Sequence, residues 1–206
     1  MQMQNRGEAA SAVPNQRQGR RMLILLVFFF SVPMITVLLM HHYNWHPQTR
    51  SHGDLVSPPR ALHIPEKLMT VQGVYVESEI LKNKWSMVYV AQDCAQLCEQ
   101  RMHQLRQLHA SLAKNINRVQ RILIASSGNL KGMHEQYPDV VILNHPESEV
   151  SALRAQFDMQ DSPAEKGNRI YLVDPLGNLM MSFSDSVPLQ DVRKDLTRLL
   201  TYSWAG

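Results

Sequence analysis

The sequence predicts an α/β domain, a central mixed sheet flanked by helices, preceded by one transmembrane helix. Residues 22–40 carry no charge and are nearly all Leu, Ile, Val, Phe and Met, which approaches the roughly 20 residues that cross a bilayer. Beyond them, short apolar runs typical of strands alternate with longer helical patterns. The only two cysteines, Cys94 and Cys98, stand where a predicted strand passes into a helix. Together these features predict an anchored domain with a thiol site.

The apolar run is predicted to be an uncleaved anchor. Four arginines precede it against the single acid Glu8, so the positive-inside rule places the N-terminus in the cytoplasm. A cleavable signal peptide is the alternative. The run, however, is longer than the roughly 7–15 residues of a signal h-region, and residues 41–45 offer no small-residue cleavage pattern. We therefore expect a disordered cytoplasmic tail at 1–20 and a transmembrane anchor at 21–41.

Residues 42–67 are predicted to form an extended linker, because four prolines and several histidines interrupt any apolar period. The remaining residues, 68–206, are enough for one globular domain with its own core. The net charge of +3 comes partly from the arginines of the tail. No nucleic-acid motif is visible, so we expect a membrane partner and no nucleic-acid partner.

The order of elements within 68–206 follows from the apolar periods and the turn residues. An extended segment is expected at 70–78, a turn at 175–178, strands at 85–91, 121–127, 140–143, 169–174 and 179–184, and helices at 94–115, 147–157 and 188–203. The last helix has Pro188 near its first position, where a missing N–H costs nothing. Strand, helix, strand, helix, hairpin and helix is the order of a thioredoxin-like α/β domain.

The two cysteines are the candidate site residues. Unpaired backbone N–H groups and the dipole at a helix N-terminus favour thiolate, and the i, i+4 spacing places both sulfurs on one helical face. Asp93 is the expected N-cap, which would put Cys94 in the first turn and make it the more reactive thiol. The pair is compatible with redox chemistry, a soft metal, or a structural disulfide that would stabilise the fold only modestly.

The stretch 85–98 (WSMVYVAQDCAQLC) resembles the Sco/SenC family of copper-handling cytochrome c oxidase assembly proteins, and 170–179 looks like that family's strand-and-hairpin segment. The resemblance implies a thioredoxin-like fold with copper bound by Cys94 and Cys98. It implies a cytochrome c oxidase subunit or a copper-assembly factor as the partner. It is also in keeping with a single-pass protein of the bacterial inner (plasma) membrane whose C-terminal domain lies in the periplasm.

The chain departs from two patterns. The family joins its cysteines to a histidine a few residues before the second motif, and residues 164–169 contain none. Two thiolates can still hold Cu(I), whereas a Cu(II) site would lack its third ligand. Thioredoxin-type reductases use a Cys-x-x-Cys pair and a proline just before the strand at 169–174, and Pro163 lies too early for that. The chain looks like a divergent relative.

Other side chains have simple structural interpretations. Met102 follows Cys98 by one turn and, with the leucines after it, is expected in the core. His103 is expected to face solvent. His134 and His145 are expected in loops, and His145, which follows a strand, is the best substitute metal ligand.

The sequence thus predicts a membrane-anchored protein that assists cytochrome c oxidase assembly by Cu(I) transfer or by thiol reduction. In the first role both sulfurs bind the metal. In the second, Cys94 attacks a partner disulfide and Cys98 resolves the mixed disulfide. A conventional enzyme is not expected, thiol–disulfide reductase activity being the exception. The alternative is a non-catalytic scaffold or docking domain with a structural disulfide.

Overall fold

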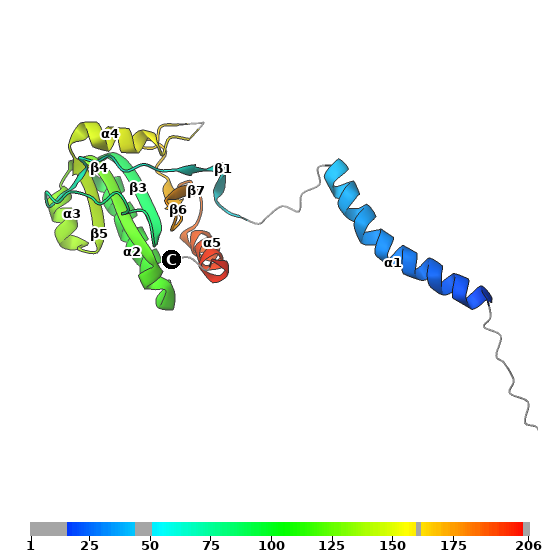
Figure 1. Cartoon of the computed structure of the whole chain (residues 1–206). Coiled ribbons are helices and arrows are strands. Elements are labelled where there is room, and N and C mark those ends of the chain that lie inside the picture. Colours follow the sequence, from blue (N-terminus) through cyan, green and yellow to red (C-terminus); the bar gives the residue numbers. More distant parts are fainter. Residues whose placement is uncertain (1–15, 44–50, 160–161, 204–206) are drawn as a thin grey trace, which may run out of the picture. The chain divides into compact units, whose positions relative to one another are not determined.

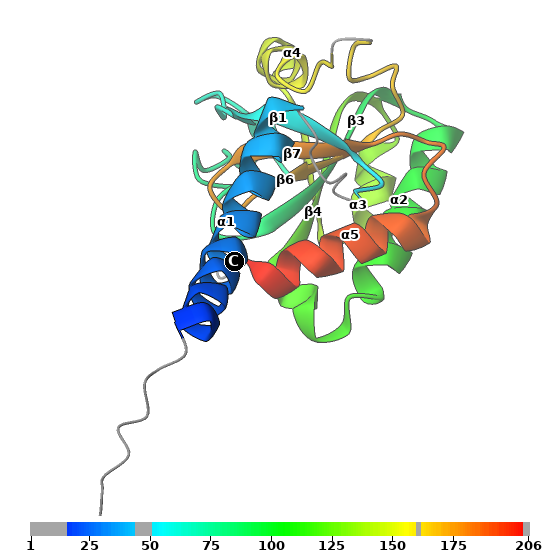
Figure 2. The ribbon, with the colours of Figure 1, turned by 90° about the vertical axis from the view of Figure 1, so that its right-hand side faces the viewer.

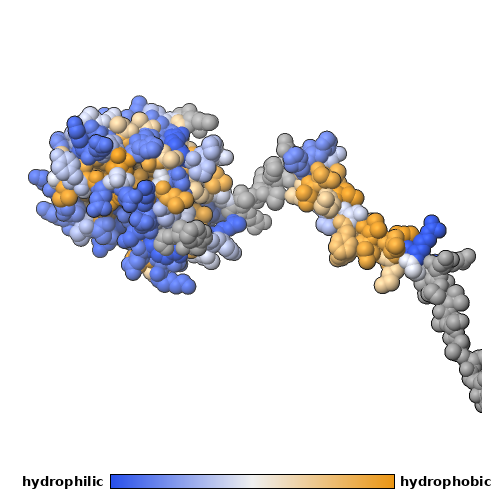
Figure 3. All heavy atoms as spheres, viewed as in Figure 1, coloured by the Kyte–Doolittle hydropathy of each residue, from blue (hydrophilic) through white to orange (hydrophobic). Residues whose placement is uncertain are grey.

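The computed structural model describes residues 16–43, 51–159 and 162–203, and the chain divides into two compact units, Met1–Arg50 and Ser51–Gly206. In the first unit the described part is one helix, α1 (Gln16–His42). Its stretch Gly19–His42 is long and apolar enough to cross a membrane, and its middle is orange, hydrophobic, in Figure 3. The predicted apolar helix is therefore confirmed, as an anchor or a signal sequence.

The predicted disordered tail at 1–20 lies mostly outside the described residues. Its last part does not: α1 begins at Gln16, so residues 16–20 are helical rather than disordered. The helix can extend past the apolar run because its backbone hydrogen bonds are internal and do not depend on apolar side chains.

The second unit is built on a seven-stranded mixed sheet in the order β1-β7-β6-β3-β4-β5-β2 (Figure 1). The neighbours β3, β4 and β5 are parallel, and the remaining pairs are antiparallel. The strands are β1 (Asp54–Ala61), β2 (Met69–Thr70), β3 (Trp85–Cys94), β4 (Val119–Gly128), β5 (Val140–His145), β6 (Ile170–Val173) and β7 (Asn178–Phe183).

Helices cover both faces of this sheet. The α2, α3 and α5 side chains pack into one core cluster and those of α4 into the other, and Figure 2 shows α4 on the side opposite α2 and α5. The bounds are α2 (Gln96–Ala110), the 3₁₀ helix η1 (Ala113–Arg118), α3 (Leu130–Gln136), α4 (Glu147–Ala155) and α5 (Leu189–Tyr202). This confirms the predicted thioredoxin-like architecture.

The central strand β3 is buried on both of its faces. Met87 and Tyr89 belong to the core cluster under α2 and α5, whereas Val88 and Val90 belong to the cluster under α4. Because both faces of this strand are covered, neither face carries polar side chains for contact with solvent. That is why it appears in the sequence as one continuous apolar run.

Three predicted boundaries change. Part of the predicted linker 42–67 is the edge strand β1, where a proline removes no ladder hydrogen bond if its missing N–H would face solvent. The predicted extended segment 70–78 contributes only a short strand, β2. The predicted helix 94–115 begins two residues later and ends at Ala110, because Ala113, at φ 49°, leaves the helical conformation.

A buried cation lies in β4. Arg121 is 1% exposed, and its Nη2 donates a hydrogen bond to Asp139, while Nε and Nη1 have no partner among the described residues. The Nδ1 atom of His109 lies 3.9 Å from the same carboxylate. Burial raises the pKa of Asp139, but the hydrogen bond and the charge of Arg121 outweigh burial and hold this pKa below its usual value.

Candidate functional site

The two cysteines lie on different elements. β3 continues to Cys94, because Asp93 and Cys94 pair with the last two residues of β4. Ala95 is the N-cap of α2, and Cys98 is the third residue of that helix. The predicted N-cap role of Asp93 is therefore wrong: its carboxylate instead accepts a hydrogen bond of 2.9 Å from Ser127 Oγ. The first turn of the helix holds Cys98 and not Cys94.

A disulfide joins Cys94 to Cys98, with the two Cα atoms 4.9 Å apart. Both residues are buried, at 4% and 2% exposed, and they belong to the core cluster under α2. The three residues between them are exposed, including Leu97 at 55%. The pair thus forms part of the core directly beneath a short exposed segment.

Gly128 allows the backbone of β4 to lie close to Cys94. It ends β4 opposite Cys94 and has a φ of +112°, which L side chains rarely adopt. A Cβ at this position would lie 2.7 Å from the carbonyl oxygen of Cys94 and 3.0 Å from its nitrogen. Only glycine allows β4 to approach Cys94 this closely.

The N-terminus of α2 favours a thiolate when the disulfide is reduced. No side chain at the N-cap accepts a hydrogen bond from the first turn, and the first N–H groups of any helix lack partners within the helix. Such groups, with the helix dipole, lower the pKa of a thiol beside them. The expectation that Cys94 is the more reactive thiol stays a prediction, because Cys94 lies just before the helix rather than in its first turn.

A polar cluster is centred on Arg101 of α2. Arg101, buried one turn after Cys98, pairs with Asp185. Its Nη2 also donates to the backbone oxygen of Asn168 (3.3 Å), and its Nε to Asn168 Oδ1 (3.4 Å). Tyr89 Oη donates to the same Oδ1 at 2.8 Å. Burial raises the pKa of Tyr89, against the opposing charge of Arg101.

This cluster binds segment 164–169 to α2. Asn168 lies in the stretch where the resemblance implies a third metal ligand. Its side chain is an amide whose oxygen accepts hydrogen bonds from Tyr89 and Arg101. Sequence reasoning missed Arg101 and Asn168. The one available signal was an arginine three residues after Cys98 and directly before Met102, which is expected in the core.

The histidines do not complete a metal site. Across 16–43, 51–159 and 162–203, no group of three or more His, Cys, Asp or Glu side chains could hold a metal ion. His103 is exposed and Met102 is fully buried, both as predicted. His134 and His145 were expected in loops but lie in α3 and at the end of β5. His134 Nε2 is hydrogen-bonded to Gln72 at 2.6 Å.

The donor set fits copper only in part. Two thiolates released by reduction of the disulfide suit the soft ion Cu(I), whereas the described residues offer no third ligand for Cu(II). Cys94 and Cys98 would hold Cu(I) between them.

Known structures share this fold. Yeast Sco1 with copper bound is 17% identical, with a TM-score of 0.58 over 69% of this chain and 94% of that one. BsSco, a member of the Sco family of cytochrome c oxidase assembly proteins with a disulfide switch, is 20% identical, with a TM-score of 0.52 over 72% and 99%. A thiol:disulfide interchange protein from Bacteroides sp. is 14% identical, with a TM-score of 0.51 over 70% and 92%. At these identities the likeness shows the fold alone.

A search of curated protein sequences finds no significant match. A family model described as "Transmembrane-like, thioredoxin-like, C-terminal domain" matches residues 85–203, from the first residue of β3 to the residue after α5. This span exceeds half of the chain and contains both cysteines. The protein therefore belongs to this family of transmembrane-like, thioredoxin-like C-terminal domains.

Proposed function

We propose that this protein exchanges a disulfide with a partner protein through Cys94 and Cys98 during cytochrome c oxidase assembly, the partner being an oxidase subunit or a copper-assembly factor. The disulfide between the cysteines carries the proposal, because the chain's only thiols form it at the uncapped start of a helix. The oxidase context is supported by the fold likeness to BsSco, and the exchange chemistry by the likeness to the Bacteroides interchange protein.

The exchange runs in two steps. With the pair reduced, the Cys94 thiolate attacks a partner disulfide, forming a mixed disulfide and releasing one partner thiolate. The Cys98 thiolate then attacks Cys94, which restores the Cys94–Cys98 disulfide and releases the second partner thiolate. Two electrons pass from the pair to the partner, and each partner thiolate takes up a proton. A dithiol reductase must return two electrons to the pair.

Reciprocal serine variants test this order. In the reduced full chain, we expect Cys98→Ser to accumulate a mixed disulfide with a disulfide-bonded test peptide, because nothing resolves it. Cys94→Ser is expected to form at least about tenfold less, since its remaining thiol belongs to Cys98, which is only 2% exposed. Non-reducing mass spectrometry measures both adducts. If the wild-type pair never reduces the peptide and neither variant traps it, the scaffold alternative with a structural disulfide is favoured.

Cu(I) transfer is the second candidate function. It is favoured by the short Cα separation of the two sulfur-bearing residues and by the fold shared with copper-bound yeast Sco1. We expect the reduced full chain to take one Cu(I) from a competing chelator under anaerobic titration, and either serine variant to lose this binding. A chain that fails to compete with the chelator contradicts copper transfer and leaves disulfide exchange in place.

For the location, we propose that α1 stays in a bacterial inner membrane with its N-terminus in the cytoplasm and Ser51–Gly206 in the periplasm. The arginines before the apolar stretch support this topology. Retention of the full chain in membranes washed with alkaline carbonate, together with protease access to the domain from the periplasmic side, is the expected result. Release of a shortened domain would show a cleaved signal instead.

A further inference from the structure

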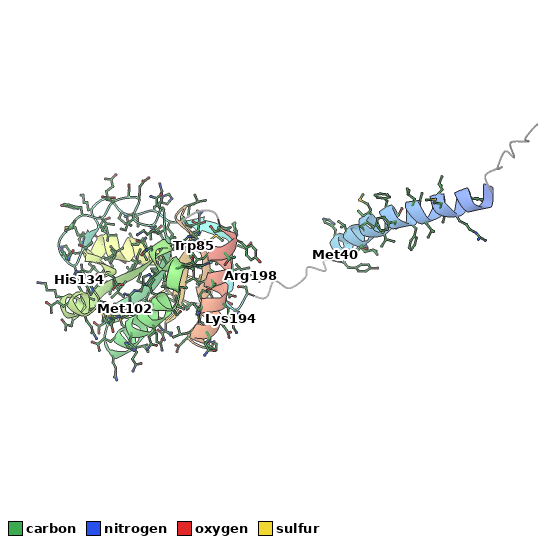
Figure 4. The ribbon with its side chains drawn as sticks, turned by 90° about the horizontal axis from the view of Figure 1, so that it is seen from below. Met40, Trp85, Met102, His134, Lys194 and Arg198 are labelled. Carbon is green, nitrogen blue, oxygen red and sulfur yellow. A yellow bond between two sulfur atoms is a disulfide. The ribbon has the colours of Figure 1, made fainter. Side chains whose placement is uncertain are left out.

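A mostly apolar groove lies where the start of β3 meets the end of α5. It has a volume of about 510 Å³, and its lining includes Trp85, Asp174, Leu176, Met180, Arg198 and Tyr202. The carboxylate of Asp174 already accepts hydrogen bonds from the backbone N–H groups of Leu176 and Asn178. Figure 4 shows Trp85 beside the helix that carries Lys194 and Arg198. The groove lies at the opposite end of β3 from Cys94, so it is separate from the cysteine site.

The groove presents a buried hydrogen-bond donor without an acceptor and, at its rim, exposed apolar side chains. Trp85 is 3% exposed, yet its Nε1 has no hydrogen-bond partner among the described residues, and a buried indole N–H ordinarily finds an acceptor. At the rim, Leu176 is 72% and Tyr202 is 82% exposed. Neighbouring exposed apolar side chains typically mark an interaction surface. The occupant should therefore combine an oxygen acceptor with apolar groups.

The exposed face of α5 beside the groove is basic. Arg193, Lys194 and Arg198 line it together. Lys194 is bonded to Asp191 at 2.8 Å, whereas no acidic partner of Arg193 or Arg198 occurs in the described part of the chain. Two unpaired guanidinium groups next to an apolar groove complement an anionic, amphipathic ligand.

The first residues of the domain are bonded to α5. His52 N donates to Asp195 Oδ2 at 2.7 Å and Gly53 N to the same oxygen at 3.3 Å, so the start of the domain is bonded to the middle of α5. Residues 43–51 separate His52 from His42, the last residue of α1, and a chain of that length spans at most about 35 Å. With α1 retained as proposed above, α5 stays within reach of the membrane.

We propose that the groove and the basic face of α5 dock on anionic phospholipid in the membrane that holds α1. Arg193 and Arg198 pair with lipid phosphates, because basic residues near an anionic surface are attracted to it. Tyr202 and Leu176 enter the interfacial region that aromatic and apolar side chains favour. The Trp85 N–H donates to an oxygen of a lipid headgroup inside the groove.

Docking at this end sets the position of the cysteines. The ten residues of β3 run from Trp85 to Cys94, a strand length of roughly 30 Å. The disulfide would then be held at the end of the domain away from the bilayer, facing the part of a membrane-bound partner that projects into solution.

Spin labels on the full chain test the docking. Leu176→Cys or Thr201→Cys is labelled with the native disulfide intact, and the chain is reconstituted into nanodiscs of phosphatidylcholine, with or without phosphatidylglycerol. Ser148→Cys, on α4 at the other face of the sheet, is the control. We expect the first two labels to become more accessible to oxygen than to a water-soluble nickel chelate in anionic discs only. The control label should stay aqueous.

The arginines provide the matched variants. Arg193→Gln with Arg198→Gln is expected to lower the docked-to-free ratio by about tenfold or more, and high salt should act in the same direction. Labels at 176 and 201 that stay equally aqueous in both discs, on a chain that co-elutes with the discs, would overturn the docking alone. A chain that elutes without the discs would contradict the anchor, and with it the docking.

Discussion

Gly128→Ala is expected to lower the free energy of unfolding by about 2–4 kcal/mol, because an L side chain is strained at this φ and its Cβ meets the backbone of Cys94. Urea unfolding of the full chain in mild detergent measures this. Since the atoms that must yield are the carbonyl and the nitrogen of Cys94, the disulfide should also shift. We expect the rate at which dithiothreitol reduces this disulfide to change by about tenfold. A tenfold change in rate corresponds to about 1.4 kcal/mol in activation free energy.

Gly73→Ala separates the two causes. Gly73 also has a positive φ, +77°, but nothing lies within 4 Å of the position of its added Cβ. Gly73→Ala should therefore lower the free energy of unfolding only by the cost of the strained backbone conformation, about 1 kcal/mol. It should leave the rate of disulfide reduction unchanged. Equal losses for the two variants would show that the close approach of Gly128 to Cys94 has no energetic consequence.

Asp139→Asn is expected to lower the free energy of unfolding by about 2–3 kcal/mol, because it leaves the buried guanidinium of Arg121 without its counter-charge. The estimate stays below that for a fully buried pair, since the Asp139 side chain is 56% exposed. Glu79→Gln is the matched control: its ion pair with Lys82 is exposed on both sides and should contribute no more than about 0.5 kcal/mol. Urea unfolding at pH 7 compares the two losses.

The same carboxylate predicts an acid limb in stability. Because the pKa of Asp139 is lower in the folded chain, its charge contributes stability that is fully present above the unfolded-state pKa of about 4. That contribution is lost as the pH falls through the lower folded-state value. Asp139→Asn should therefore lose less stability than the wild type as the pH falls below about 4. Parallel acid profiles for both proteins would contradict the role of this pair.

Local pattern was enough for most of the fold. The continuous apolar run of β3, the Pro-Leu-Gly-Asn turn after β6 and the amphipathic α5 each predict their element, because each signal lies within one segment. β1 was not predicted. Its prolines and polar residues resemble a linker, and only pairing with β7 makes it a strand, a contact between residues more than 100 positions apart.

The candidate site was likewise predicted only in part from local sequence patterns. Two cysteines at the end of an apolar run predict a thiol site, since strand, junction and helix are neighbours in sequence. The end of β3, however, depends on β4: pairing with Ser127 and Gly128 extends the strand to Cys94 and takes Asp93 out of the helix cap. Gly128 matters because β4 lies against Cys94, which no pattern within 85–98 can report.

Sequence alone was therefore sufficient for the apolar helix, for most elements of the domain and for the place of the two cysteines where a strand passes into a helix, because short-range chemistry encodes all three; β1 and α3 were not predicted. The tertiary structure decided which element carries each cysteine, that Asn168 and Arg101 fill the stretch where a third ligand was sought, and that a basic helix borders an apolar groove. These features are contacts between segments far apart in the chain. They exist only once the sheet has assembled and brought those segments together.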